Sequence, residues 1–278
     1  PPCASGAGRG LEEKDMKYRQ ILFNTPMVQA ILEGRKTQTR RLPWLQPGPE
    51  IELRIKKTED GKIVAHFYRE NPLYDEANKS PYGAYQEPMC QVGDVLWVRE
   101  TWTEDGRNFY YRADFESDWL DPCETLSGGY PIYCSYHPEC EGCTREKQRI
   151  HWHPSIHMPK EAARIFLKVT NIRVERLQEI TDAGALKEGV PSDDDFPMDE
   201  VYCPTCHGQG LHGALHPVSL GYMEVDCENC DTPVKRFSHL WDSTIKKQHV
   251  IYYGWEANPW VWVYEFERIE KPEGWPHV

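Results

Sequence analysis

The sequence predicts an α+β protein with one domain over residues 16–269, a small closed β-barrel with short flanking helices. Three observations predict this fold. About six or seven short runs alternate between apolar and polar residues, as strands do. Two or three amphipathic segments have the length of short helices. Cysteine-rich insertions interrupt the pattern at about 117–150 and 195–233, and residues 270–278 form a tail. Many short strands of this kind suit a small closed barrel.

The N-terminal elements begin after a leader. Residues 1–15 lack an apolar core and are expected to be a disordered leader or a tag. Tyr18–Phe23 alternates and is rich in strand-forming residues, so it predicts the first strand. Thr25 followed by Pro26 predicts a helix N-cap and first turn, and Gly34 predicts the end of that helix.

The middle of the chain predicts a hairpin and two further strands. Residues 51–55 and 62–68 alternate on either side of an Asp-Gly turn, which is typical of a hairpin. Residues 70–90 contain several prolines and predict a long loop. Short apolar runs at 95–98 and 109–112 predict buried strands.

The C-terminal half predicts two strands and two helices. Residues 165–174 form a long alternating run that predicts a strand. Thr181 predicts the N-cap of a short helix that runs to Glu188 and ends at a glycine. Residues 234–247 predict an amphipathic helix, and 260–266, apolar on both faces, predicts a closing strand.

The charge of the chain limits its partners. The formal net charge is −12, so the overall field repels nucleic acid and disfavours binding to duplex DNA. No apolar run is long enough to span a bilayer, which predicts no membrane partner and a cytoplasmic location. A local basic stretch, Arg35 to Arg41, is the exception. Its cations either bind a ligand or offset the negative end of the preceding helix.

Four cysteines have the spacing of a metal site. Cys203 and Cys206 form one pair separated by two residues, and Cys227 and Cys230 form another. Each such gap lets two thiolates reach one ion, and two pairs complete a closed tetrahedron. With no secretory signal in view, metal ligation is favoured over disulfides. The spacing therefore predicts a structural zinc ion with no open coordination position.

A second cysteine array is looser. Cys140 and Cys143 form one close pair, and Cys123 and Cys134 stand singly. The glycine-rich insertion around them needs a cross-link to be ordered, which predicts a second zinc site. The alternative is a set of free thiols in an irregular insertion.

Several motifs, in order along the chain, carry a resemblance to a known family. They include the strings at 31–41, 93–98, 152–159, 185–189 and 254–263. In these segments the chain resembles the ASCH family of PUA-like β-barrels, in particular the larger bacterial and prophage-encoded members. The resemblance covers most of 16–115, 150–195 and 237–269 but neither cysteine-rich insertion. It implies a PUA-like barrel whose ligand is a nucleoside, a nucleotide or single-stranded RNA.

The ASCH signature Gly-x-Lys-x-x-Glu-x-Arg is matched at Gly34, Lys36 and Arg41, with Thr39 in the place of the glutamate. Small ASCH proteins that hydrolyse the amide of N4-acetylcytidine also have a threonine there. Their activity is attributed to a lysine, that threonine and a glutamate on a later helix. The resemblance therefore implies Lys36, Thr39 and Glu188 as catalytic residues of an amide hydrolase.

Two other functions compete with hydrolysis. One is a binding module without catalysis, in which aromatic and basic side chains hold a base. Its ligand-binding candidates are Arg41, Arg99, Trp102, Tyr111 and His157. The other is a ribonuclease in which Lys36 and His157 take part. Each candidate also has a purely structural explanation, such as a helix-end cation, a core aromatic residue or a solvated helix-end acid.

Overall fold

Five strands form the central sheet of the computed structural model. In spatial order they are β1 (Tyr18–Leu22), β6 (Val95–Arg99), β11 (Phe166–Arg176), β14 (Trp260–Ile269) and β2 (Gln38–Arg41). β1 and β6 are parallel, and the other neighbours are antiparallel. The structure describes residues 16–47, 51–69, 85–120, 124–128, 148–195, 198, 200–215 and 222–276.

The sheet is open within the described part of the chain, so the predicted closed barrel is not found there. β1 and β2 are its two edges, and no strand pairing between described residues joins them, although Arg41 Nη2 donates a hydrogen bond to the Leu22 carbonyl at 2.9 Å. The short connection between these strands holds helix α1 (Thr25–Leu32), which buries Val28 and Ile31 in the core. The connection therefore covers the sheet with a helix and does not pair one edge with the other. The coarser prediction of a mixed α+β fold, mostly strands with few helices, is confirmed.

β14 is buried on both faces, as its sequence predicts. Trp262, Tyr264 and Phe266 belong to one hydrophobic core, together with α1 and parts of β6 and β11. Val261 and Val263, on the opposite face, pack in a second core with helices α2 (Asp182–Lys187) and α3 (Pro233–Thr244). Because side chains alternate along a strand, one strand separates two layers of the molecule.

Helix α1 begins one residue earlier than predicted. Asn24, and not Thr25, is the N-cap, because its Oδ1 accepts a hydrogen bond from the Met27 N–H at 3.0 Å. Pro26 lies in the first turn, where a backbone N–H has no partner within the helix, so the absence of an N–H in proline costs no hydrogen bond. Gly34 follows the helix with φ +79°, the left-handed conformation expected of a glycine that ends a helix.

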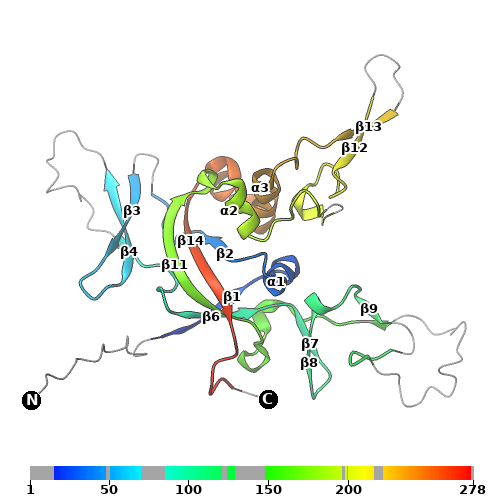
Figure 1. Cartoon of the computed structure of the whole chain (residues 1–278), viewed down its shortest axis with the longest axis horizontal. Coiled ribbons are helices and arrows are strands. Elements are labelled where there is room, and N and C mark those ends of the chain that lie inside the picture. Colours follow the sequence, from blue (N-terminus) through cyan, green and yellow to red (C-terminus); the bar gives the residue numbers. More distant parts are fainter. Residues whose placement is uncertain are drawn as a thin grey trace, which may run out of the picture.

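Smaller sheets surround the central one. The predicted hairpin is present as β3 (Ile51–Lys57) and β4 (Ile63–Arg69), to which β5 (Tyr85–Gln86) adds a third strand. β8 (Phe109–Tyr111) was predicted, but its partner β7 (Trp102–Glu104) was not. Figure 1 shows these two small sheets on different sides of the central sheet. Most of the loop predicted at 70–90 lies outside the described residues.

The described residues of the C-terminal half contain three further helices. α2 (Asp182–Lys187) has the predicted N-cap, Thr181, whose side chain accepts from the Gly184 N–H. α3 (Pro233–Thr244) buries the predicted stripe Phe237, Leu240 and Trp241 but ends three residues earlier than predicted. α4 (Val250–Tyr253) is a single turn that the sequence did not predict. Short 3-10 turns include Ser155–His157, Lys160–Ala162, Lys247–His249 and Trp255–Ala257.

The two cysteine-rich segments are described to different extents. In the second, β12 (Leu211–Leu215) and β13 (Tyr222–Asp226) form a hairpin that extends away from the rest of the molecule in Figure 1. In the first, β9 (Trp119–Leu120) pairs with β10 (Gln148–Arg149). Cys123, Cys134, Cys140 and Cys143 all lie outside the described residues, so the second zinc site stays a prediction.

Candidate functional site

The first site is the cluster of Cys203, Cys206, Cys227 and Cys230. All four are buried, and their Sγ atoms lie within 4.8 Å of one another. The Sγ atoms of Cys203 and Cys227 are 3.6 Å apart, as are those of Cys206 and Cys230. Thiolates about 2.3 Å from one zinc ion at tetrahedral angles lie about 3.8 Å apart, whereas disulfide sulfurs lie about 2 Å apart. The cluster therefore fits a tetrahedral metal ion and does not fit two disulfides.

The chain after Cys206 turns back towards its sulfur. His207, Gly208 and Gly210 have positive φ angles, and the Gly210 N–H donates to Cys206 Sγ at 3.3 Å. Burial raises the pKa of the Cys206 thiol, but this hydrogen bond and those from the other cysteines outweigh it and give a pKa of about 7. Hydrogen bonds to ligand atoms orient a metal site in this way.

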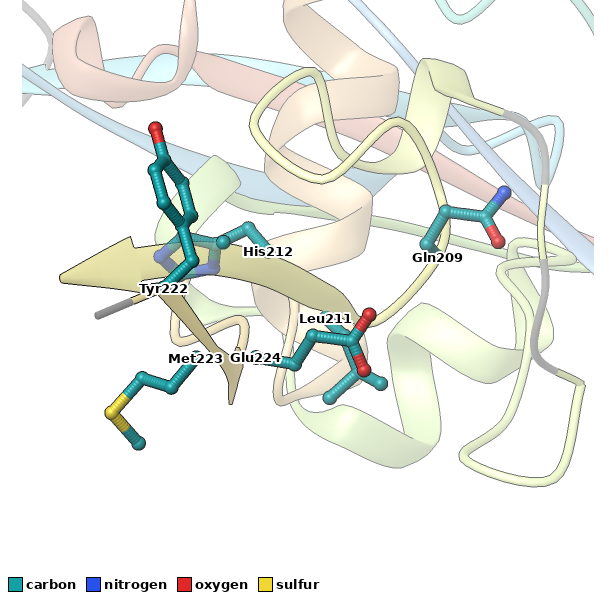
Figure 2. Close-up of a pocket in the computed structure, with 7 residues that line it drawn as sticks. Gln209, Leu211, His212, Tyr222, Met223 and Glu224 are labelled. Atoms are coloured by element: carbon teal, nitrogen blue, oxygen red, sulfur yellow. The ribbon is translucent and has the colours of Figure 1, made fainter. Parts of the chain in front are cut away.

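A hollow of about 490 Å³ lies on the β12–β13 hairpin and is also lined by Gln209. Figure 2 shows side chains from both strands around it, with Tyr222 standing out from the sheet. Leu211 and Met223 are also exposed there. The hollow contains none of the residues predicted to be catalytic.

The second site is centred on Lys36. Lys36 Nζ donates three hydrogen bonds, to the Gln38 carbonyl at 2.9 Å, the Glu188 carbonyl at 2.7 Å and Glu188 Oε2 at 2.9 Å. Lys36 and Glu188 are only 2% and 3% exposed. The structure thus brings together two predicted residues that lie 152 positions apart. An ammonium group has three donors, so the chain itself satisfies all of them.

The contact between these residues is part of a helix cap. The last carbonyls of a helix have no partner within it, and here two of them, and the carbonyl of the residue that follows, receive donors from the basic stretch. The Lys187 carbonyl accepts from the Thr37 N–H at 2.9 Å, the Glu188 carbonyl from Lys36 Nζ, and the Gly189 carbonyl from Arg35 Nη1 at 3.0 Å. The cations therefore offset the end of α2, and not that of α1 as the sequence suggested.

Gly189 makes this close approach possible. Its φ is +88°, and a Cβ atom there would lie 2.7 Å from the Ala30 Cβ and 3.0 Å from the Lys36 Cβ. A side chain would therefore both strain the backbone and separate α2 from the basic stretch.

Arg40 extends the charged cluster. Arg40 Nη1 donates to Glu188 Oε1 at 2.9 Å, so the two oxygens of Glu188 serve one cation each. Arg40 Nη2 pairs with Glu175, and the guanidinium lies over the Phe237 ring, 5.6 Å from its centroid. Arg40 Nε is buried without a hydrogen-bond partner among the described residues. The sequence placed Arg40 in the basic stretch, but Arg40 was not among the predicted site residues.

The pKa of Lys36 is lowered by its burial and by two nearby cations. Burial is the largest cause, and the charges of Arg41 and Arg40 add to it, whereas Glu188 raises the pKa. A carboxylate such as Glu188 raises the pKa of a neighbouring lysine and so makes it less able to act as a base at neutral pH. Here the effect of burial outweighs that of Glu188. Burial likewise lowers the pKa of Arg41, partly opposed by Glu188.

Thr39 and Arg41 point to the opposite face of β2 from Arg40, because side chains alternate along a strand. Thr39 is buried and pairs in register with Tyr264. The guanidinium of Arg41 lies 5.1 Å from the centroid of the Phe23 ring, and Lys36 Nζ lies 5.4 Å from it. Lys36 therefore lies between Glu188 and the face that carries Thr39 and Arg41.

The other ligand-binding candidates form a separate group. Arg99 donates to Gln20 Oε1 at 2.9 Å and to the Ile156 carbonyl, and it lies over the Trp97 ring. Trp102 is buried, and its Nε1 has no hydrogen-bond partner in the described part of the chain. These contacts make both residues part of the packing around β6 and β7.

Tyr111 is held by contacts within the protein. Its hydroxyl donates to the Ala162 carbonyl at 2.6 Å, and burial raises its pKa to about 12. Arg164 lies over its ring, 3.9 Å from the centroid, and forms two hydrogen bonds with the buried Glu100, at 2.8 and 2.9 Å. Burial raises the pKa of Glu100, and Arg164 opposes this. Sequence analysis missed this ion pair, which no local motif indicates.

His157 is exposed in the turn Ser155–His157, and no contact between described residues joins it to Lys36. The rings of His151 and His153 lie 5.0 Å apart, and His153 also lies 5.0 Å from Trp102. The histidines therefore lie beside the β7 strand and not beside the charged cluster.

Comparison of the chain with protein-family models, curated proteins and solved structures gave no match. No helix in the described ranges combines the length and the apolar character needed to cross a bilayer. The chemistry of the two sites is therefore what indicates a function.

Proposed function

We propose that the chain is a PUA-like protein of the ASCH type that binds an N-acylated cytidine-type nucleoside beside Lys36 and hydrolyses its amide. The observation that carries the proposal is the direct contact of Lys36 with Glu188 at 2.9 Å, between a basic stretch and a helix end far apart in sequence. Thr39 follows in the adjacent strand, so the three residues implied by the resemblance come from one neighbourhood.

The proposed reaction assigns one role to each side chain. Lys36 passes a proton to Glu188, a transfer that burial favours because it removes two charges from a region with little water. The neutral amine then takes the proton of the Thr39 hydroxyl as its oxygen attacks the amide carbon. Arg41 stabilises the negative charge on the carbonyl oxygen.

The remaining steps restore the enzyme. Lys36 gives the proton from Thr39 to the leaving nitrogen of the base, which breaks the amide bond and leaves an acyl ester on Thr39. Water then attacks this ester while the Lys36 amine takes a proton from it. Lys36 gives that proton to the Thr39 oxygen as the ester bond breaks, which releases the carboxylic acid. Glu188 keeps its proton throughout and returns it to Lys36 at the end.

The test is acetate release from N4-acetylcytidine. We expect the wild-type protein to produce acetate and cytidine, and Thr39→Val, which keeps the side-chain shape, to lower the rate at least about 100-fold. Thr103→Val is the matched control, since Thr103 is also a buried strand threonine. The rate should change little with pH while the Lys36–Glu188 pair retains its proton, because the proton passes from Lys36 to Glu188 and none is released to solvent. Absence of acetate with the wild-type protein would reject the hydrolase.

Binding without turnover is the second candidate, and one observation favours it. All three donors of Lys36 are satisfied by the chain, so no lone pair of Lys36 faces Thr39 until a proton has moved. In that case N4-acetylcytidine binds and is recovered unchanged, and Thr39→Val alters affinity only. Isothermal titration alongside the acetate assay separates the two functions. No contact described above favours a ribonuclease.

We also infer that the four-cysteine cluster holds a structural zinc ion. The donor set supports this, since four thiolates suit zinc and leave no position for a substrate. Metal analysis of the purified protein should give one zinc per cluster, lost in Cys227→Ser with Cys230→Ser. Retention of zinc by that double variant would contradict the assignment.

A further inference from the structure

A small basic and aromatic surface lies outside both sites. It is formed by residues 246–253, here called the 246–253 ridge, which include the turn Lys247–His249 and helix α4. Lys246 and Lys247 are exposed, and no carboxylate among the described residues lies within ion-pair distance of either. The ridge itself contains no acidic residue, in a chain whose net charge is −12.

Three aromatic rings lie next to one another on the ridge. The rings of His249 and Tyr253 are stacked, with centroids 6.1 Å apart and planes 17° apart, and Tyr252 lies 6.3 Å from Tyr253. Tyr252 is 63% exposed and Ile251 is 74% exposed. An exposed ring and an apolar side chain beside two lysines can pack against a flat ligand while the lysines bind its charge.

The ridge is held in place by helix α3. Trp241 Nε1 donates to the Tyr253 carbonyl at 2.8 Å, and Asp242 Oδ1 accepts from the Trp255 N–H at 2.7 Å. A Cβ atom on Gly254 would lie 2.6 Å from the Val250 carbonyl oxygen, so the chain turns tightly there. The backbone at the end of the ridge is therefore held in place before any partner binds, which lowers the entropic cost of binding.

We propose that the 246–253 ridge binds single-stranded nucleic acid, with bases stacked on Tyr252 and backbone phosphates on Lys246 and Lys247. The strand must be single because stacked and paired bases cannot pack on a protein ring. Two adjacent lysines without an acidic residue give the ridge a local positive charge that can bind phosphates, although the net charge of the chain is −12. A membrane surface fits less well, because α4 has only 4 residues and cannot bury an extended apolar face in a bilayer. The proposal does not depend on whether the Lys36 site hydrolyses an amide.

Fluorescence anisotropy with a labelled oligouridylate of about twelve nucleotides tests the proposal. Tyr252→Ala should weaken binding about tenfold, as loss of one stacked base does. Lys246→Gln with Lys247→Gln should lower the slope of log affinity against log salt by about 1.4, since each phosphate contact on a single strand contributes about 0.7. A deoxyuridine oligonucleotide of the same length shows whether the partner is RNA or DNA, and binding of either through Tyr252 supports the proposal.

Matched controls come from other surfaces. Tyr222 is 87% exposed on the β12–β13 hairpin, so Tyr222→Ala removes a similarly exposed tyrosine. Lys56→Gln with Lys57→Gln removes two neighbouring exposed lysines from β3. The proposal is overturned if these variants weaken binding as much as the ridge variants. It is also overturned if Tyr252→Ala binds like wild type, or if duplex RNA binds as tightly as the single strand. Binding of anionic lipid vesicles through Tyr252, without binding of either oligonucleotide, would overturn it as well.

Discussion

The four-cysteine cluster and the charged cluster around Lys36 are both buried groups of polar side chains, but they are assembled differently. Each cysteine pair is local, with two residues between its members, and the geometry of one pair is fixed by a short turn. The charged cluster joins the basic stretch to the end of α2, far along the chain. The first owes its order to covalent spacing and ligand chemistry, and the second to the packing of α2 against β2.

The largest effect on stability is expected from loss of the metal ion proposed for the four-cysteine cluster. Cys227→Ala with Cys230→Ala should lower the free energy of unfolding by at least about 5 kcal/mol, because structural zinc contributes folding energy directly. The four cysteines also belong to the hydrophobic core that contains Leu240 and Trp241. Thermal unfolding and zinc content are the measurements. Cys90→Ala, a buried cysteine in the other core, should keep the zinc. Equal losses in both variants would contradict the prediction.

The second largest effect is expected from the buried ion pairs of Glu188. Glu188→Gln should cost about 3–5 kcal/mol, because it leaves Lys36 and Arg40 with a neutral partner in a buried position. Chemical denaturation gives the free energy of unfolding. Glu33→Gln is the matched control, since Glu33 pairs with Arg35 on the surface and should change stability by less than about 1 kcal/mol. If the two substitutions cost the same, the charged cluster has no special structural role.

A smaller effect is expected at the other buried ion pair. Glu100→Gln should cost about 1–2 kcal/mol, because Arg164 is partly exposed and still pairs with Asp114 after the change. The same denaturation experiment compares it with Glu188→Gln. A larger loss for Glu100→Gln would show that the number of remaining partners does not decide the cost.

The smallest effect is a pH dependence. Burial lowers the pKa of Lys36 from its ordinary value of 10.5, so the unfolded chain binds this proton more tightly than the folded chain. The stability of the wild type relative to Lys36→Met should therefore rise as the pH approaches 10.5 from below. It should fall as the pH decreases through the lowered pKa of Lys36. Denaturation of both proteins between pH 7 and pH 10.5 measures this difference, and a decrease with rising pH would contradict it.

Most individual elements could be predicted because their signals are local. Thr181 and Gly189 mark the two ends of α2, and the nearly continuous apolar run at 260–266 marks a strand buried on both faces. The strands β7, β9 and β10 were missed because segments of two or three residues contain too little alternation to read. The prediction of a closed barrel was wrong for the described residues, because a local sequence pattern does not indicate which strands pair.

The sequence by itself determined the two cysteine pairs near 203 and 227, because the short spacing limits where their sulfur atoms can go. It also determined that Lys36 and Arg40 lie in one basic stretch. Only the tertiary structure decided that these cations cap α2 and share Glu188, and that Thr39 lies on the other face of β2. The reason is physical. Contacts between distant segments depend on how whole elements pack, and a linear pattern records only the period and the ends of each element.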